Sequence, residues 1–130
     1  MDKKEVLSVL NNYNFPKNDF IVLSGAAMVL MGIKESTNDI DISASKKFYN
    51  QLLKDYSCKL EKIDKDGAKI YFIDDVINFG SRYFDTDYLI YEGYQLQTPL
   101  AIKQLKQLLN RDKDKNDIYL IDKYLEEHNG

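Results

Sequence analysis

Residues 20–43 carry two different hydrophobic patterns in succession, and these patterns limit the folds open to the chain. Residues 20–23 form a continuous apolar run, which is typical of a strand buried on both faces. Residues 38–43 alternate between polar and apolar side chains, which predicts a half-buried strand. Between them, residues 26–31 are good helix formers that end at Gly32. The segment therefore predicts strands and a helix that alternate along the chain.

The remaining segments extend this order. Apolar spacing predicts helices over residues 2–12 and 46–56, another from Pro99 to about residue 110, and a last helix that includes residues 118–124; Ser45 and Thr98 are expected as caps. Further strands are expected over residues 58–63, 68–73, 76–79, 88–91 and 94–97. We expect an α+β fold with a small mixed sheet of about five strands, helices packed against it and a C-terminal helix pair. The chain, residues 1–130, is expected to form a single domain.

The composition leaves few residue types that could carry out chemistry. Cys58 is the only cysteine and His128 the only histidine, which excludes an internal disulfide and a structural zinc site made of these residues. Catalysis would therefore depend on carboxylates, lysines, hydroxyls and metal ions. The net charge of −3 argues against a broad basic surface for nucleic acid, and a local patch remains open. Because no apolar run approaches about eighteen residues, we expect a cytoplasmic protein without a membrane partner.

Asp39 and Asp41 form the first candidate site. At alternate positions of the predicted strand they share one face, with their carbons about 6–7 Å apart, while Ile40 and Ile42 turn inward. Carboxylates this close repel each other unless a cation lies between them. Mg²⁺ prefers oxygen ligands and is usually held by one or two carboxylates together with substrate phosphates. The pair therefore indicates a Mg²⁺ site, and the alternative is a solvated strand face.

Two further segments could bind phosphate. Ser24 and Gly25 lie between the buried strand and the next helix, where free backbone N–H groups can meet an anion; the alternative is a tight turn that needs a glycine. Lys103 lies one turn into a later helix and could reach a phosphate or extend into solvent. For the charged run over residues 111–118, the alternative interpretation is a solvated loop between helices with local ion pairs.

The order and spacing of these segments resemble the nucleotidyltransferase superfamily, which is built on a polymerase-β-like minimal core. The resemblance is closest to the small bacterial branch related to abortive-infection nucleotidyltransferase toxins. It rests on residues 23–28 and 32–42, on the helix that carries Lys103, and on a final pattern of Arg111, Lys113, Asp114, Asp117 and Ile118. It covers about residues 20–121 in the family's order. It implies a nucleotidyltransferase-like fold.

The resemblance also implies roles for the matching residues. Asp39 and Asp41 would bind Mg²⁺ and act in catalysis. Many members have a third acidic residue on a central strand; Asn78 falls at or near that position, and Asp75 or Asp74 would occupy it in another register. We take Asp75 as the expected catalytic residue. The residues implied to bind the nucleotide or to order the loops around it are Ser24, Gly25, Thr37, Lys103, Arg111 and Asp114.

The implied activity is Mg²⁺-dependent transfer of a nucleoside monophosphate from a nucleoside triphosphate (NTP) to a hydroxyl group. The acceptor is open between a nucleic acid such as tRNA, a protein and a small molecule, and a homodimer or a cognate partner protein could complete its site. A toxin–antitoxin or phage-defence system is the implied context. The alternative is a catalytically degenerate nucleotide-binding or interaction module, because asparagine cannot act as a general base.

Overall fold

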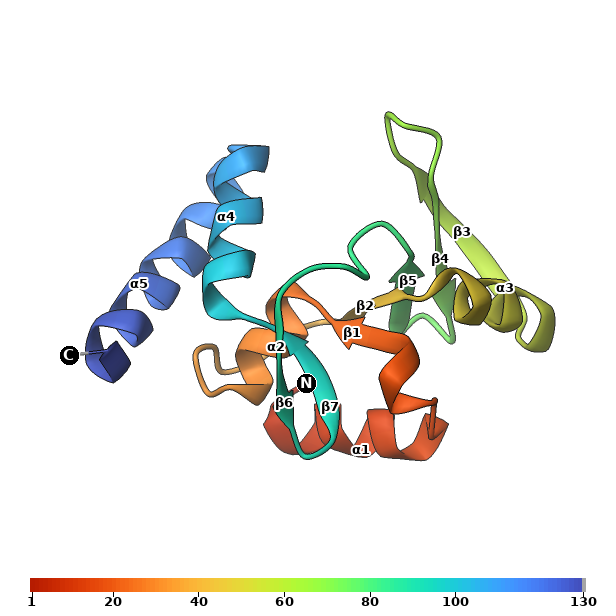
Figure 1. Cartoon of the computed structure of the whole chain (residues 1–130), viewed down its shortest axis with the longest axis horizontal. Helices are drawn as coiled ribbons and strands as arrows, with labels where there is room; N and C mark the ends of the chain where they lie inside the picture. Colours follow the sequence, from red (N-terminus) through yellow and green to blue (C-terminus); the bar gives the residue numbers. More distant parts are fainter. Residues whose placement is uncertain (130) are drawn as a thin grey trace.

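The computed structural model describes residues 1–129, and within them five α-helices and seven strands follow one another (Figure 1). The helices are α1 (Lys3–Tyr13), α2 (Ser24–Leu30), α3 (Lys46–Asp55), α4 (Pro99–Leu109) and α5 (Lys115–Asn129). The strands are β1 (Phe20–Val22), β2 (Ile40–Ala44), β3 (Cys58–Ile63), β4 (Lys69–Ile73), β5 (Ile77–Gly80), β6 (Tyr88–Tyr91) and β7 (Tyr94–Gln97). Short 3-10 helices occupy Lys17–Asp19 and Asp112–Asp114.

Side-chain caps determine where three of the helices begin. Asp2 accepts a hydrogen bond from the backbone N–H of Glu5, and the Glu5 side chain bonds back to Asp2, which completes a capping box for α1. Ser45 caps α3 and Thr98 caps α4, with Pro99 at the first helical position, as the sequence predicts. Each cap satisfies N–H groups that have no partner inside the helix.

All seven strands join one mixed sheet in the order β3-β4-β5-β2-β1-β7-β6. The β2–β5 and β1–β7 pairs are parallel, and the other neighbouring pairs are antiparallel. The α+β class is confirmed, whereas the expected sheet of about five strands is too small, because both predicted hairpins, β3–β4 and β6–β7, extend the same sheet. The central position of β2 places Asp41 near the middle of the sheet.

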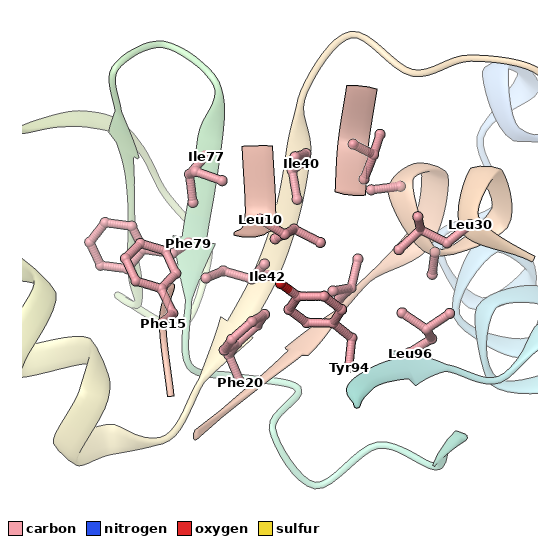
Figure 2. Close-up of a cluster of buried hydrophobic side chains, with 14 of the residues drawn as sticks. Leu10, Phe15, Phe20, Leu30, Ile40, Ile42, Ile77, Phe79, Tyr94 and Leu96 are labelled. Atoms are coloured by element: carbon pink, nitrogen blue, oxygen red, sulfur yellow. The ribbon is translucent and has the colours of Figure 1, made fainter. Parts of the chain in front are cut away.

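The two faces of the sheet differ in character. One face, here called the core face, presents Val22, Ile42, Phe79 and Leu96 to a single hydrophobic cluster that also contains side chains from α1, α2 and α3. Figure 2 shows Ile40, Ile42, Ile77 and Phe79 from the parallel pair β2–β5 beside Leu10 and Phe15. The other face, here called the site face, carries a row of directly neighbouring residues across four strands: Asp41, Asn78, Phe72 and Lys59.

Two structures stand at opposite ends of the sheet. The β3–β4 hairpin forms one edge, and the α4–α5 pair follows β7 near the other, as Figure 1 shows. Ile102 of α4 and Ile121 of α5 are buried in the same hydrophobic cluster as the sheet, which attaches the helix pair to it. Within residues 1–129, no helix is both long and apolar enough to cross a membrane.

Candidate functional site

The two predicted metal-binding carboxylates lie where β2 begins. Asp39 is in the bend before the strand, and Asp41 is its second residue. The residues on either side of Asp41, Ile40 and Ile42, are buried on the core face. This alternation turns the Asp41 side chain to the site face, as the polar–apolar pattern predicts. Strand β2 therefore holds the Asp41 carboxylate on a rigid backbone between two paired strands.

The surroundings of Asp41 oppose its negative charge. Burial raises the pKa of Asp41 to about 6, and the nearby charges of Asp39 and Glu61 add to the shift. Lys62 and Lys106 act in the opposite direction but do not cancel it. A divalent cation between Asp39 and Asp41 would remove this conflict, because it neutralises both carboxylates. The pair therefore fits a Mg²⁺ ion.

The number of protein ligands limits what kind of metal site this can be. In the described part of the chain, no group of three or more histidine, cysteine, aspartate or glutamate side chains is arranged to hold a metal. Two carboxylates alone suit Mg²⁺, which usually keeps waters and shares its remaining positions with substrate phosphates. The site could thus hold the metal together with a phosphate-bearing substrate.

The loop before β2 packs closely against the start of α2. The Thr37 hydroxyl donates a hydrogen bond to the carbonyl of Asp39, at 3.1 Å. A Cβ atom added at Gly25 would lie only 3.0 Å from that hydroxyl oxygen, so a larger residue would require the Thr37 side chain to shift. The Thr37 N–H and the Met1 carbonyl, 2.9 Å apart, hold the other side of the loop. The structure therefore brings Gly25 and Thr37 together beside Asp39.

Ser24 is held in an unusual backbone conformation. Its φ of 46° lies in the left-handed region, which costs a non-glycine residue energy. Its N–H donates to Oε1 of Gln97, at 3.1 Å, from the neighbouring strand β7. Gln97 is 2% exposed, and its amide nitrogen lies 3.4 Å from the Thr86 hydroxyl. Sequence reasoning missed Gln97, since only the parallel pairing of β1 with β7 brings it to Ser24.

Two lysines of α4 point to different surroundings. Lys103, the lysine implied to face the phosphates, forms an ion pair with Asp122 of α5. Lys106 is 6% exposed, and its ammonium lies 3.0 Å from Asp114 and 3.3 Å from Asp117. Of the two, it is Lys106 whose charge acts on Asp41. The sequence pattern gave no reason to prefer Lys106, because its three-residue distance from Lys103 places both near one side of the helix.

The predicted residues Arg111 and Asp114 belong to the same buried cluster as Lys106. Burial raises the pKa of Asp114, but hydrogen bonds from Arg111 and Lys106 outweigh it, so the carboxyl titrates below its ordinary value. Asp117 also pairs with Lys34, at 3.2 Å, in the loop between α2 and β2. The cluster thus connects the helix pair to the loop that carries Thr37 and Asp39.

The strand register places the neutral Asn78 next to Asp41. The two residues are direct partners in the parallel pair β2–β5. Asp74 and Asp75 instead form the turn before β5, with φ values of 54° and 55°, and Asp74 accepts a hydrogen bond from Tyr13. Asp75 lies in this exposed turn and not on the strand next to Asp41. A catalytic role for Asp75 stays a prediction.

One hollow of the surface lies away from the carboxylate pair. It measures about 330 Å³ and is formed by the end of α1 and by α3, with Phe15, Phe48 and Tyr56 among its walls. None of the predicted site residues lines it. The candidate site therefore lies on the site face of the sheet and not in this hollow.

Comparison with solved structures identifies the fold. The Megavirus polyadenylate synthase superposes with a TM-score of 0.59 at 12% identity, over 93% of this chain and 31% of that protein. The chain has a nucleotidyltransferase-like fold. JHP933 from Helicobacter pylori superposes with a TM-score of 0.58 at 16% identity, over 97% of this chain and 67% of that one.

Comparisons of the sequence gave no match. No protein-family model matches it, and no curated protein does. It spans about a third of the length of the Megavirus protein with which it shares this fold. The similarity to these two proteins is therefore one of fold alone.

Proposed function

We propose that the chain is a Mg²⁺-dependent nucleotidyltransferase that moves a nucleoside monophosphate from an NTP to a hydroxyl acceptor and releases pyrophosphate. The observation that carries the proposal is the Asp39–Asp41 pair at the start of β2, whose charge conflict a divalent cation would relieve. The nucleotidyltransferase-like fold supports it. The resemblance of the sequence favours a toxin–antitoxin or phage-defence system as the context.

In the proposed reaction, Asp39 and Asp41 would hold Mg²⁺, which would supply positive charge next to the triphosphate. The acceptor oxygen bonds to the α-phosphorus, the bond from that phosphorus to the bridging oxygen breaks, and pyrophosphate leaves. Ser24 and Gly25 are proposed to hold the triphosphate, with Thr37 keeping the adjoining loop in place. The acceptor proton passes to solvent or to a carboxylate such as Asp75, because Asn78 cannot take it.

We assign the cationic role near the phosphates to Lys106 in addition to Lys103. Lys106 is held by Asp114 and Asp117, and its charge reaches Asp41. Lys103 would first have to leave its ion pair with Asp122. Lys106 stays paired with two carboxylates, so we propose that it acts on the site through its charge from this fixed position.

One observation favours a second candidate function. Asn78 is the direct neighbour of Asp41, and the resemblance of the sequence implies that many family members have an acidic residue at or near this position. A site with two carboxylates can still bind Mg²⁺ and nucleotide, since metal binding needs only the pair and the phosphates. The second candidate is therefore a nucleotide-binding module that does not transfer the nucleotide.

A thermal-shift panel tests the proposed binding site. ATP, CTP, GTP and UTP are each added with and without Mg²⁺; a ligand at 100 times its Kd adds about 2.7 kcal/mol, which raises Tm by several degrees. We expect a Mg²⁺-dependent rise with at least one nucleotide, lost in Asp39→Asn and kept in Glu126→Gln, an exposed acid on α5. The proposal fails if no nucleotide raises Tm, or if Asp39→Asn responds like the unmodified chain.

Pyrophosphate release then separates the two candidate functions. The nucleotide that raises Tm is incubated with candidate acceptors, and pyrophosphate is measured over time. Release that requires both Mg²⁺ and Asp41 supports transfer. A Tm rise without release from any acceptor class supports the nucleotide-binding module.

A further inference from the structure

The site face continues from Asp41 onto the β3–β4 hairpin. Asp41, Asn78, Phe72 and Lys59 are direct neighbours across β2, β5, β4 and β3. Neighbouring strands lie about 4.8 Å apart, so Lys59 is about 14 Å from Asp41 along this row. A carboxylate, an amide, an aromatic ring and a cation thus follow one another on one face.

The hairpin has an excess of positive charge, although the chain carries −3. Its four lysines, Lys59, Lys62, Lys65 and Lys69, are exposed. Arg82, from the loop after β5, pairs with Asp64 at 3.0 Å and with Asp66 at 2.8 Å. Among the acidic residues of the hairpin, Glu61 alone forms no ion pair within the described chain. The lysines are therefore free to attract an anion.

Two of these lysines lie on the site face. Lys59 is opposite Phe72, and after the bulge in β3 Lys62 is opposite Ile70. Lys62 is close enough for its charge to act on Asp41. Both lysines are therefore on the same side of the sheet as the proposed metal site, and Phe72 lies between Lys59 and Asn78.

Phe72 is a half-buried aromatic ring in the middle of this row. Its neighbours along β4, Tyr71 and Ile73, turn to the core face, where Tyr71 stacks on Phe79 at 5.9 Å between ring centres. The ring of Phe72 is therefore not needed to complete the aromatic core. Aromatic rings flanked by cations are the pattern on which single-stranded nucleic acids bind, with bases stacked and phosphates paired.

We propose that Phe72, Lys59 and Lys62 form the binding surface for a single-stranded nucleic-acid acceptor. A base stacks on Phe72, phosphates lie against Lys59 and Lys62, and the strand leads its terminal hydroxyl towards Asp39 and Asp41. The role as acceptor surface rests on the proposed function, whereas binding of the strand does not. A single strand fits better than a duplex because stacking on Phe72 requires an unpaired base.

The test measures the affinity for a labelled single-stranded RNA of mixed sequence, about 12 nucleotides long, by fluorescence anisotropy over a range of salt concentrations. The variants are the double substitution Lys59→Ala with Lys62→Ala, and Phe72→Leu, which keeps an apolar side chain. The matched control is Lys47→Ala with Lys54→Ala, two exposed lysines of α3 on the core-face side. Circular dichroism and Tm verify the fold of each variant.

We expect the hairpin double variant to bind the RNA about 10-fold or more weakly and to flatten the slope of log K against log salt by about 1.4, because two phosphate contacts are lost. Phe72→Leu should weaken binding about 5-fold or more through lost stacking. The control, with the same change in charge, should bind as the unmodified chain does. Equal effects in the hairpin variant and the control, or no RNA binding at all, overturn the proposal.

Two further measurements keep this proposal distinct from the proposed function. Asp39→Asn should lose the Mg²⁺–nucleotide shift and retain RNA binding, so failure of either site is seen separately. Poly-glutamate, which represents an acidic protein acceptor, is added as a competitor of the RNA. If it displaces the RNA at equal charge concentration and Phe72→Leu has no effect, the surface is a general anion site and the nucleic-acid assignment is wrong.

Discussion

Asp41 carries a carboxyl group whose surroundings oppose its ionisation. Its carboxylate is placed on a paired central strand, where burial and the charge of Asp39 disfavour ionisation. Its folded pKa of about 6 lies above the ordinary value of 3.8. The folded chain therefore binds more protons than the unfolded chain between these two values, and its stability falls as pH rises through this window.

Asp41→Asn should consequently stabilise the metal-free protein at neutral pH. Above pH 6 the wild-type carboxylate is charged, and its removal should raise the free energy of unfolding by about 1–3 kcal/mol. Below about pH 3 the two proteins should be equally stable, because the carboxyl is then neutral in both states. Urea unfolding of both proteins at several pH values, without metal, measures the difference; Glu126→Gln is the control.

This prediction would be wrong if Asp41→Asn lowered stability at neutral pH. Such a result would mean that the carboxylate forms favourable contacts that outweigh its burial. Added Mg²⁺ gives a second readout, since it should raise the stability of the unmodified chain and leave Asp41→Asn unchanged.

At the scale of elements, a buried ionic cluster joins α4, α5 and the loop before β2. Lys106 lies between Asp114 and Asp117, and each of these acids has a second cation, Arg111 and Lys34 respectively. Every charge in the cluster therefore has an opposite partner. Such clusters add little net stability as a whole, but the loss of one member leaves the others uncompensated.

Lys106→Met should therefore be far more damaging than Lys103→Met. The first leaves two buried carboxylates short of a cation and should cost about 3–5 kcal/mol of unfolding free energy. The second removes a pair whose side chains are 25% and 51% exposed, which should cost about 1 kcal/mol or less. Equilibrium urea unfolding compares them, and similar losses would show that the cluster does not behave as a buried unit.

In the whole molecule, the central strand β2 is buried and paired on both sides, whereas the edge strand β3 is largely exposed. Apart from Asp41, the side chains of β2 are buried, and the strand is paired on both sides. β3 is paired on one side only, and Leu60 and Ile63 are 46% and 55% exposed. Its charged residues and its bulge also oppose edge-to-edge pairing with other chains.

Native-state hydrogen exchange should reproduce this difference. We expect amides of β2 to be protected about 100-fold or more above those of β3, because β3 can open without disrupting the core. NMR-detected exchange at neutral pH measures both strands in one sample. Equal protection would mean that the sheet opens as one cooperative unit from edge to edge.

Local patterns predicted much of this architecture. Apolar spacing located the helices and strands, and the caps Ser45 and Thr98 were visible because a cap acts on residues three positions away. The polar–apolar alternation of residues 38–43 predicted that Asp41 faces away from the core, as the structure shows. In each case the cause lies within a few residues of its effect.

Local sequence patterns were sufficient to predict the elements, the α+β class and the candidate carboxylate pair, because these depend on periodicity and on neighbouring residues. Three features became visible only in the folded chain: all seven strands share one sheet, Asn78 lies beside Asp41, and Gln97 accepts a hydrogen bond from the Ser24 N–H. The structure also distinguished buried Lys106 from Lys103. The physical reason is that strand register and burial are set by contacts between segments far apart in the chain, on which local propensity carries no information.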